Sequence, residues 1–152
     1  MDRLVTGSMG KILGQAIFGS EQAVFEQVEK NIDDLVANSV DWSACASKEQ
    51  LQAAREGKMG LRFFDRDVPE EWLKDVKGKR VLCLAGAGGL QAPLLACAGA
   101  EVTVIDISDK MLDKDREVAE RENLRIEIVK GNMCDLYCLT ISLAVKPDCI
   151  TL

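Results

Sequence analysis

The sequence predicts an α/β fold: a helical cap in residues 1–76, then a parallel β-sheet domain in residues 77–152 with strand order 3-2-1-4. Three observations support this prediction. Short apolar runs recur in the second half of the chain, helix patterns separate them, and the first half shows mainly helix patterns. Strands that alternate with helices form parallel βαβ units, because each helix carries the chain back across the sheet. These crossovers are right-handed, which gives the order 3-2-1 for the first three strands.

The cap begins with an amphipathic helix over about 21–39. Ser20 stands where a side-chain oxygen can cap it, and apolar residues recur every three or four positions along it. This apolar stripe consists of Val24, Val28, Ile32, Leu35 and Val36. A second helix is expected over about 48–56. After a connection, a single helical turn is expected at Pro69–Leu73, with Pro69 at a first-turn position.

The sheet domain has clear boundary signals between its elements. Gly99 follows the first helix pattern as a stop signal, and Ser108 precedes the second as a cap. The expected strands are Val81–Leu84, Glu101–Asp106, Arg125–Gly131 and, as the fourth, Asp148–Leu152. The expected helices are Leu90–Ala98 and 109–122. The first strand is continuously apolar, as expected of a strand buried on both faces.

Composition excludes several classes of protein. The chain of 152 residues has a net charge of −6, which argues against a nucleic-acid partner. It contains no histidine, so Ser-His-Asp and Cys-His catalytic arrangements are absent. Its six cysteines show no paired metal-site spacing, so we expect no metal site and reduced thiols in a cytoplasmic protein. Cys83 and Cys97 are expected in the core. No signal peptide or membrane span is expected.

The turn after the first strand is the candidate ligand site. Gly86, Gly88 and Gly89 allow a close approach of the backbone to a ligand. Asp106 closes the second strand, where a carboxylate can accept hydrogen bonds from both hydroxyls of a ribose. The glycine turn and Asp106 together predict a ligand that contains adenosine. The alternative is a tight strand–helix turn with Asp106 as a helix-capping residue. A dinucleotide fingerprint fails at Gln91, which stands where the third glycine is expected.

Residues 79–136 resemble the class I S-adenosylmethionine-dependent methyltransferases, on the motifs VLCLAGAGG, VTVIDISDKML and GNMCDL. The resemblance implies a Rossmann-like sheet, here an incomplete form of the seven-stranded methyltransferase fold, with S-adenosylmethionine as cofactor and S-adenosylhomocysteine as product. It implies that Asp106 holds the ribose hydroxyls, that Ile107 and Met133 lie near the adenine ring, and that Asp135 contacts its amino group. The implied cofactor-binding residues are Ala85, Gly86, Ala87, Gly88, Gly89, Gln91, Asp106, Ile107, Met133 and Asp135.

The segment around Trp72 is similar to that of ubiquinone/menaquinone-biosynthesis methyltransferases, in which a helical cap helps to close the cofactor pocket. Trp72 itself is expected in the core. The turn departs from the family pattern E/D-x-G-x-G-x-G, because Cys83, Ala85 and Ala87 replace an acid and two glycines. We expect weaker cofactor binding, or a replacement contact from Gln91 at the start of the next helix.

Three functions are compatible with these residues. The first is methyl transfer from S-adenosylmethionine to a small molecule, impaired if the sheet ends at the fourth strand. The second is a non-catalytic module or inactive relative that binds S-adenosylmethionine or S-adenosylhomocysteine. A weaker alternative is an NAD-binding fragment. No catalytic residue and no role for residues 137–152 emerges. An exposed sheet edge or apolar tail predicts a homodimer.

Overall fold

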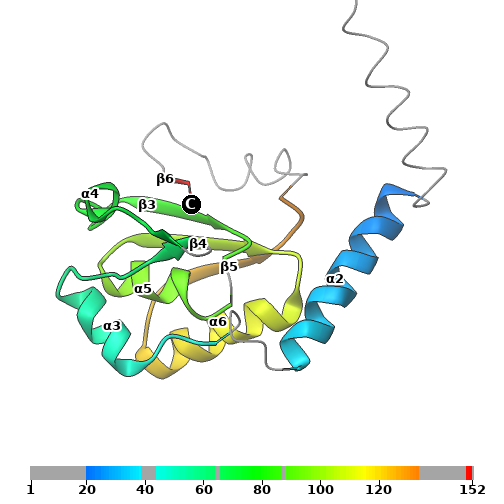
Figure 1. The fold of residues 1–152 in the computed structure, drawn as a ribbon, viewed down its shortest axis with the longest axis horizontal. Coiled ribbons are helices and arrows are strands. Elements are labelled where there is room, and N and C mark those ends of the chain that lie inside the picture. Colours follow the sequence, from blue (N-terminus) through cyan, green and yellow to red (C-terminus); the bar gives the residue numbers. More distant parts are fainter. Residues whose placement is uncertain (1–19, 39–43, 64–65, 87, 134–149, 152) are drawn as a thin grey trace, which may run out of the picture.

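The computed structural model describes residues 20–38, 44–63, 66–86, 88–133 and 150–151 (Figure 1). Of the positions discussed above, Ala87, Asp135 and three of the cysteines, Cys134, Cys138 and Cys149, lie outside these ranges. Among the described residues, no helix combines the length and the hydropathy that a membrane crossing requires.

The central sheet has four parallel strands in the order β5-β4-β3-β6. They are β3 (Arg80–Leu84), β4 (Glu101–Asp106), β5 (Ile126–Lys130) and β6 (Ile150–Thr151). When the four strands of this sheet are numbered 1 to 4 along the chain, their order across the sheet is 3-2-1-4. The predicted fold class is therefore confirmed. The short β6 pairs with β3 at Val81 and Leu82 and lies within the predicted fourth strand.

Helices α3 (Lys48–Arg55), α5 (Gln91–Cys97) and α6 (Asp109–Glu122) lie on one face of this sheet (Figure 1). The register explains which side chains meet them. Two rows of apolar residues cross the sheet on the helix side: Val81, Val102 and Ile126, then Cys83, Val104 and Ile128. These rows pack with Leu51, Leu94, Leu95, Leu112 and Val118 from the three helices. The core is therefore one layer of side chains between the sheet and the helices.

Helix caps fix where the helices begin. Ser108 accepts the Met111 N–H through its hydroxyl, and Ser47 forms a capping box with Gln50 at the start of α3. α6 ends at Asn123, whose left-handed conformation (φ +52°) stops the helix. The predicted bounds of α6 and β4 agree with the structure. α3 comes from the predicted cap yet packs against α5, and the domain boundary at residue 76 stays a prediction.

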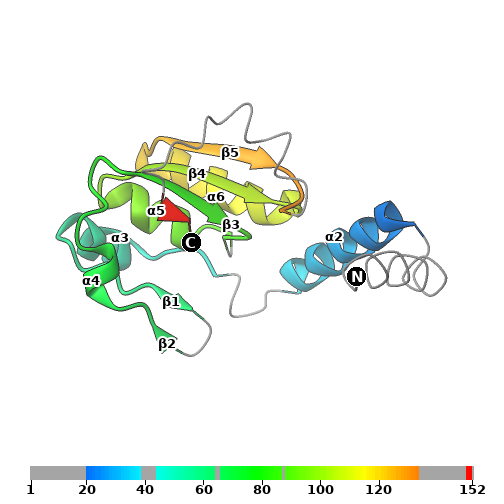
Figure 2. The ribbon, with the colours of Figure 1, turned by 90° about the horizontal axis from the view of Figure 1, so that it is seen from above.

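Helix α2 (Glu21–Ala37) begins at the Ser20 cap, as predicted. It stands beside the carboxyl ends of β4 and β5, at one end of the molecule (Figure 2). Its apolar stripe is only partly covered. Val36 is buried, whereas Val28 is 40% exposed and Leu35 is 46% exposed. The stripe therefore does not seal a core, and part of it remains available to line a cavity.

Two features of the connection between α3 and β3 differ from the prediction. An antiparallel pair, β1 (Arg62–Phe63) and β2 (Arg66–Asp67), occupies what was expected to be a loop. The one-turn helix α4 (Glu70–Leu73) starts after Pro69, which is the N-cap and not a first-turn residue.

The prediction that Trp72 belongs to the core is wrong, because its side chain is 68% exposed. α4 is a single turn of four residues, so little more than one of its side chains can face the core. Leu73 takes that position and Val76 follows it into the core, while Trp72 points away from the core. A single helical turn has too few residues for the spacing of apolar positions to identify the inward face.

Candidate cofactor site

The turn after β3 is held in an unusual backbone conformation. Ala85 has φ +51°, in the left-handed region that favours glycine, and its N–H donates to the Ile105 carbonyl at 2.9 Å. Gly88 (φ +41°) and Gly89 (φ +78°) also lie in this region. The position that is glycine in the family pattern thus keeps a glycine-like conformation with an alanine. Such strain is typical of ligand-binding turns.

The glycines of the turn are required by packing within the chain. A Cβ on Gly88 would lie 2.9 Å from the Met111 sulfur, and one on Gly89 would lie 2.8 Å from the Cys45 sulfur. A Cβ on Gly86 would come within 3.2 Å of Val104. The sequence suggested that these glycines make room for a ligand. The structure shows that they allow α6 and the segment before α3 to pack closely on the turn.

Asp106 lies at the carboxyl end of β4 with only 6% of its surface exposed. One carboxylate oxygen, Oδ1, accepts the Ser108 N–H at 2.8 Å. Burial raises the pKa of Asp106, and the backbone N–H groups of Ser108 and Ile107 oppose that rise. The helix cap itself is Ser108, and the bond of Asp106 is a local one to the Ser108 N–H. It uses one oxygen atom, and the residue also borders a cavity.

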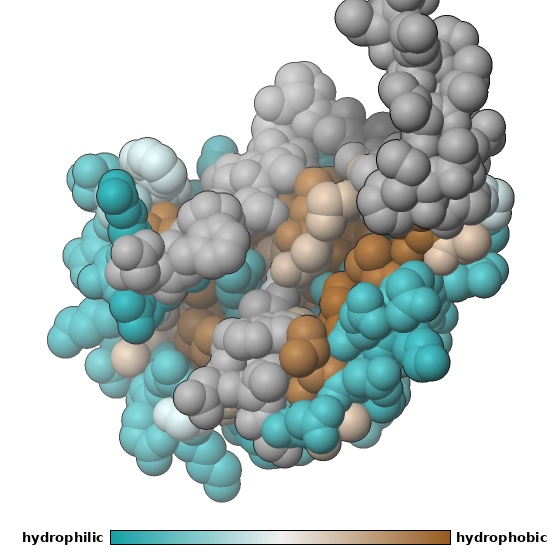
Figure 3. All heavy atoms as spheres, turned by 45° about the vertical axis from the view of Figure 1, so that its right-hand side comes forward, coloured by the Kyte–Doolittle hydropathy of each residue, from teal (hydrophilic) through white to brown (hydrophobic). Residues whose placement is uncertain are grey.

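This cavity has a volume of about 350 Å³ and lies between α2 and the carboxyl ends of the strands. Among the described residues its lining is mostly apolar, and of these only Asp106 and Asn132 bring polar side chains. The lining residues are Phe25, Val28, Ile32, Ala85, Ile105, Asp106, Ile107, Met111, Gly131, Asn132 and Met133. Figure 3 shows hydrophobic surface gathered into a band on the side of the molecule turned forward, with hydrophilic residues beside it. A flat apolar ring with hydroxyl groups at one edge fits such a lining.

Four of the ten predicted cofactor-binding residues come together on this cavity: Ala85, Asp106, Ile107 and Met133. Gly86, Gly88 and Gly89 are buried in the turn behind it, and Gln91 is half-buried as the first residue of α5. These four are not part of the cavity lining. Ala87 and Asp135 lie outside the described residues, so their roles stay predictions.

Sequence reasoning missed one wall of the cavity. Phe25, Val28 and Ile32 of α2 line it. Val28 and Ile32 were assigned to the apolar stripe of a helix with no ligand role, and Phe25 was not assigned at all. The difference arises because α2 packs beside the ends of the strands and not on the face of the sheet.

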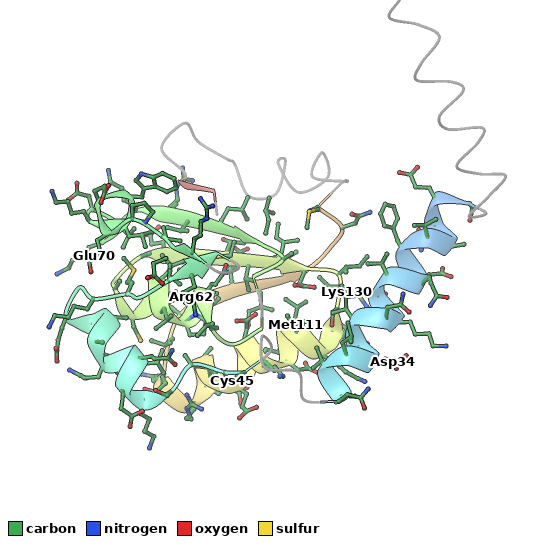
Figure 4. All side chains as sticks on the ribbon, in the orientation of Figure 1. Asp34, Cys45, Arg62, Glu70, Met111 and Lys130 are labelled. Carbon is green, nitrogen blue, oxygen red and sulfur yellow. The ribbon has the colours of Figure 1, made fainter. Side chains whose placement is uncertain are left out.

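Polar contacts hold α2 in this place. Asp33 accepts the Ser108 hydroxyl hydrogen through its carboxylate and the Lys110 ammonium through its backbone carbonyl at 3.0 Å. Lys130, at the end of β5, bridges Glu29 of α2 at 2.7 Å and Asp109 of α6 at 2.6 Å. Those two carboxylates raise the pKa of Lys130. Figure 4 shows Lys130 beside α2 and Met111 at the start of α6.

A second depression, of about 600 Å³, lies at the amino ends of the same strands. Charged residues such as Arg80, Glu101, Arg125 and Glu127 border it. In open α/β sheets ligands bind at the carboxyl ends of the strands, where helix N-termini and loops converge. The smaller apolar cavity beside Asp106 is therefore the candidate site.

Comparison with known proteins agrees with this geometry. The profile of the family described as "Methyltransferase domain" matches residues 81–145. The Bacillus subtilis (strain 168) protein named "Uncharacterized methyltransferase YbaJ" is 44% identical over 105 residues, which are 68% of this chain and 41% of that protein. The chain thus spans less than half the length of this curated relative.

Two solved structures are similar at low identity. The O-methyltransferase from Bacillus cereus, in complex with S-adenosylhomocysteine, has 17% identity and a TM-score of 0.47, covering 95% of this chain and 60% of its own. The C-terminal domain of precorrin-6Y C5,15-methyltransferase from Rhodobacter capsulatus has 14% identity and a TM-score of 0.38, covering 55% and 47%. The family match, the curated relative and the strand order together support a methyltransferase domain of the class I, S-adenosylmethionine-dependent type in this chain.

Proposed function

We propose that the protein binds S-adenosylmethionine in the cavity beside Asp106 and transfers its methyl group to a small molecule. The observation that supports this most is the position of Asp106. It is a buried carboxylate at the carboxyl end of β4 and borders an apolar cavity next to the turn after β3. A ligand with two vicinal hydroxyls and an apolar ring satisfies both features.

The roles proposed for the residues follow from this placement. Asp106 accepts hydrogen bonds from the ribose hydroxyls, and Ile107 and Met133 pack against the adenine ring. The turn of residues 85–89 and Gln91 lie toward the methionine part, and Asp135 contacts the adenine amino group. When bound, the cofactor supplies an activated methyl group on a sulfonium. The contribution of this chain is to orient that group and to exclude water, which needs no acid–base residue.

The proposed acceptor is a small molecule. The net charge of −6 disfavours a polyanionic partner such as nucleic acid. Phe25, Val28 and Ile32 make the outer wall of the cavity apolar, and the exposed part of Val28 extends this surface beyond it.

Titration calorimetry with S-adenosylmethionine, S-adenosylhomocysteine and NAD tests the proposal, followed by an assay for methyl release. We expect both sulfur ligands to bind and NAD not to bind. Binding without turnover on any acceptor supports the non-catalytic module. Absence of binding at millimolar ligand contradicts both functions, and binding of NAD alone would establish the third.

Asp106→Ala is the sharpest variant for this test. Loss of hydrogen bonds from two hydroxyls to a charged acceptor is expected to weaken binding by about 2–4 kcal/mol. Glu101→Gln is the matched control, because it removes a carboxylate from the exposed amino end of the same strand. Equal affinity of wild type and Asp106→Ala for S-adenosylhomocysteine would show that the ligand does not lie as proposed.

We also propose that the chain forms a homodimer through the sheet edge beside β6 or through the apolar residues that precede it. Strand β6 is the edge of the described sheet, and an unpaired strand edge is a template for association. Light scattering at micromolar concentration tests this directly. A monomeric mass contradicts it.

A further inference from the structure

Helix α6 carries an ionisable residue where its pattern calls for an apolar one. Its buried residues are Met111, Leu112, Asp115 and Val118, at the spacing of a single helix face. Asp115 is 1% exposed. A carboxylate in this position has lost its hydration, and a buried polar group is retained only with hydrogen bonds to replace it. The hydrogen bonds that Asp115 accepts therefore indicate its role.

Asp115 bonds the turn after β3. Its Oδ1 accepts the N–H of Gly89 at 2.7 Å, in buried surroundings. The carbonyl of Gly89 accepts the N–H of Ala46 at 2.8 Å, and the carbonyl of Ala46 accepts the Arg121 guanidinium at 2.9 Å. Asp115 and Arg121 both belong to α6. Gly89 is thus held at both its N–H and its carbonyl oxygen by a ring of bonds that starts and ends on one helix.

The turn has no room to move within this ring. Gly89 has φ +78°, and a Cβ there would lie 2.8 Å from the Cys45 sulfur and 3.1 Å from the Lys114 carbonyl. Four residues earlier, Ala85 lines the cavity, and two residues later Gln91 opens α5. A displacement of Gly89 would be passed to both, because each lies within four residues of it along the chain.

We propose that Asp115 is a positioning residue, which fixes Gly89 and through it the shape of the turn that faces the cofactor. This inference rests on the proposed function, in which residues 85–89 contact S-adenosylmethionine. Asp115 does not line the cavity and acts through Gly89. The charged groups that act on the pKa of its carboxyl are Asp106 from β4, which raises it, and Arg116 from α6, which lowers it.

Substitutions at Asp115 separate positioning from stability. Asp115→Asn keeps an oxygen that accepts the Gly89 N–H, so affinity for S-adenosylhomocysteine is expected to stay within about threefold of wild type. Asp115→Leu makes the buried face of α6 fully apolar and removes the acceptor of the Gly89 N–H. It is expected to stay folded and to weaken binding about tenfold or more. Asp115→Ala serves the same purpose if leucine does not fit.

Val118→Ala is the matched control on the same helix face. It opens a small cavity in the core and lowers stability without touching the turn, so affinity is expected to be unchanged below its unfolding transition. If Asp115 were merely structural, affinity would follow stability across the four variants. Wild-type affinity in a folded Asp115→Leu or Asp115→Ala protein would overturn the proposal.

Amide exchange of Gly89, followed by nuclear magnetic resonance, tests the inference without any ligand. Relative to core amides that exchange only by global unfolding, Asp115→Leu or Asp115→Ala is expected to speed exchange of this amide about tenfold or more, whereas Asp115→Asn and Val118→Ala leave this ratio near its wild-type value. If wild type binds neither S-adenosylmethionine nor S-adenosylhomocysteine, the proposed function fails, and this measurement still decides whether Asp115 holds the turn. Unchanged exchange in both acceptor-free variants would contradict that role.

Discussion

The hydroxyl of Ser108 donates a hydrogen bond to the Asp33 carboxylate and so joins the start of α6 to α2. The same oxygen accepts the Met111 N–H as the N-cap of α6. One buried side chain therefore begins a helix of the sheet domain and places the helix that walls the cavity. Folding of the domain and formation of the candidate site share this residue.

Ser108→Ala is expected to lower the free energy of unfolding by about 1–2 kcal/mol, because α6 loses its N-cap. It is also expected to weaken binding of S-adenosylhomocysteine, because α2 loses its tie to Ser108. Urea unfolding and calorimetry measure the two effects. Ser47→Ala removes the cap of α3 alone and is expected to lower stability without weakening binding. Equal affinities in the two variants would contradict the link to α2.

Gly88→Ala is expected to destabilise the fold by about 2–4 kcal/mol, as the sum of a left-handed backbone and an overpacked contact. The new methyl group would lie 3.0 Å from the Met111 carbonyl, which the helix backbone holds in place. Urea unfolding measures the loss. Gly78→Ala is the control, because Gly78 has φ +73° and nothing within 4 Å of its Cβ position. Only the backbone cost, about 1–2 kcal/mol, is expected there. Similar losses in both variants would exclude the close packing described for Gly88.

Ala85→Gly is expected to raise the free energy of unfolding by about 0.5–1 kcal/mol. Relief of the left-handed conformation outweighs the extra entropy of glycine in the unfolded chain. Binding of S-adenosylhomocysteine is expected to tighten, because a methyl group leaves the cavity lining. Asn123→Gly provides the comparison, since Asn123 is the other described non-glycine residue with positive φ. It ends α6 away from the cavity, so its affinity should match wild type. Weaker binding by Ala85→Gly would show that the methyl group contributes a contact.

Asp115 is expected to make stability depend on pH. Burial raises its pKa from 3.8 to about 7, with a smaller contribution from the charge of Asp106, while the Gly89 N–H and Arg116 oppose the rise. Between these two values the folded state holds a proton that the unfolded state has released. The extra stability is complete below about pH 4 and is lost as pH rises through about 7.

Comparison of wild type with Asp115→Asn isolates this effect. Between pH 5 and pH 8 the free energy of unfolding of wild type is expected to fall by about 2–3 kcal/mol more than that of the variant. Urea unfolding at the two pH values measures the difference. Asp113→Asn, an exposed change on the same helix, should follow wild type. A parallel course of wild type and Asp115→Asn would show that Asp115 is ionised throughout this range.

The sheet and its helices were predictable because their signals are local. The bounds of β4 and α6 follow from an apolar run that ends at Asp106 and from a serine cap with a full helical stripe. Pairing of β6 with β3 was also anticipated, from an apolar run at the fourth-strand position. Asp106 was predicted as a site residue by its place at the end of a strand, which topology determines, whereas Ile107 was predicted from the family resemblance.

The rest depends on contacts between distant segments. The wall formed by Phe25, Val28 and Ile32 exists only because α2 packs beside the strand ends, and the polar partners that hold it there are 75 to 101 residues away along the chain. Asp115 had no role assigned from the sequence, because its hydrogen-bond partner Gly89 is 26 residues away along the chain. Trp72 was misplaced because one helical turn carries no periodicity.

The docking of α2 has a thermodynamic consequence. Its described polar ties include Lys130, whose side chain is 46% exposed, and two of the five residues of its apolar stripe, Val28 and Leu35, are exposed. Such a helix can detach without opening the core, as a separate unit of local unfolding. A ligand in the cavity beneath α2 then binds with a lower apparent affinity, which is proportional to the fraction of molecules in which α2 is docked. Because added salt screens the pairs of Lys130, that fraction falls as ionic strength rises. Even an uncharged nucleoside should therefore bind this cavity more weakly in concentrated salt.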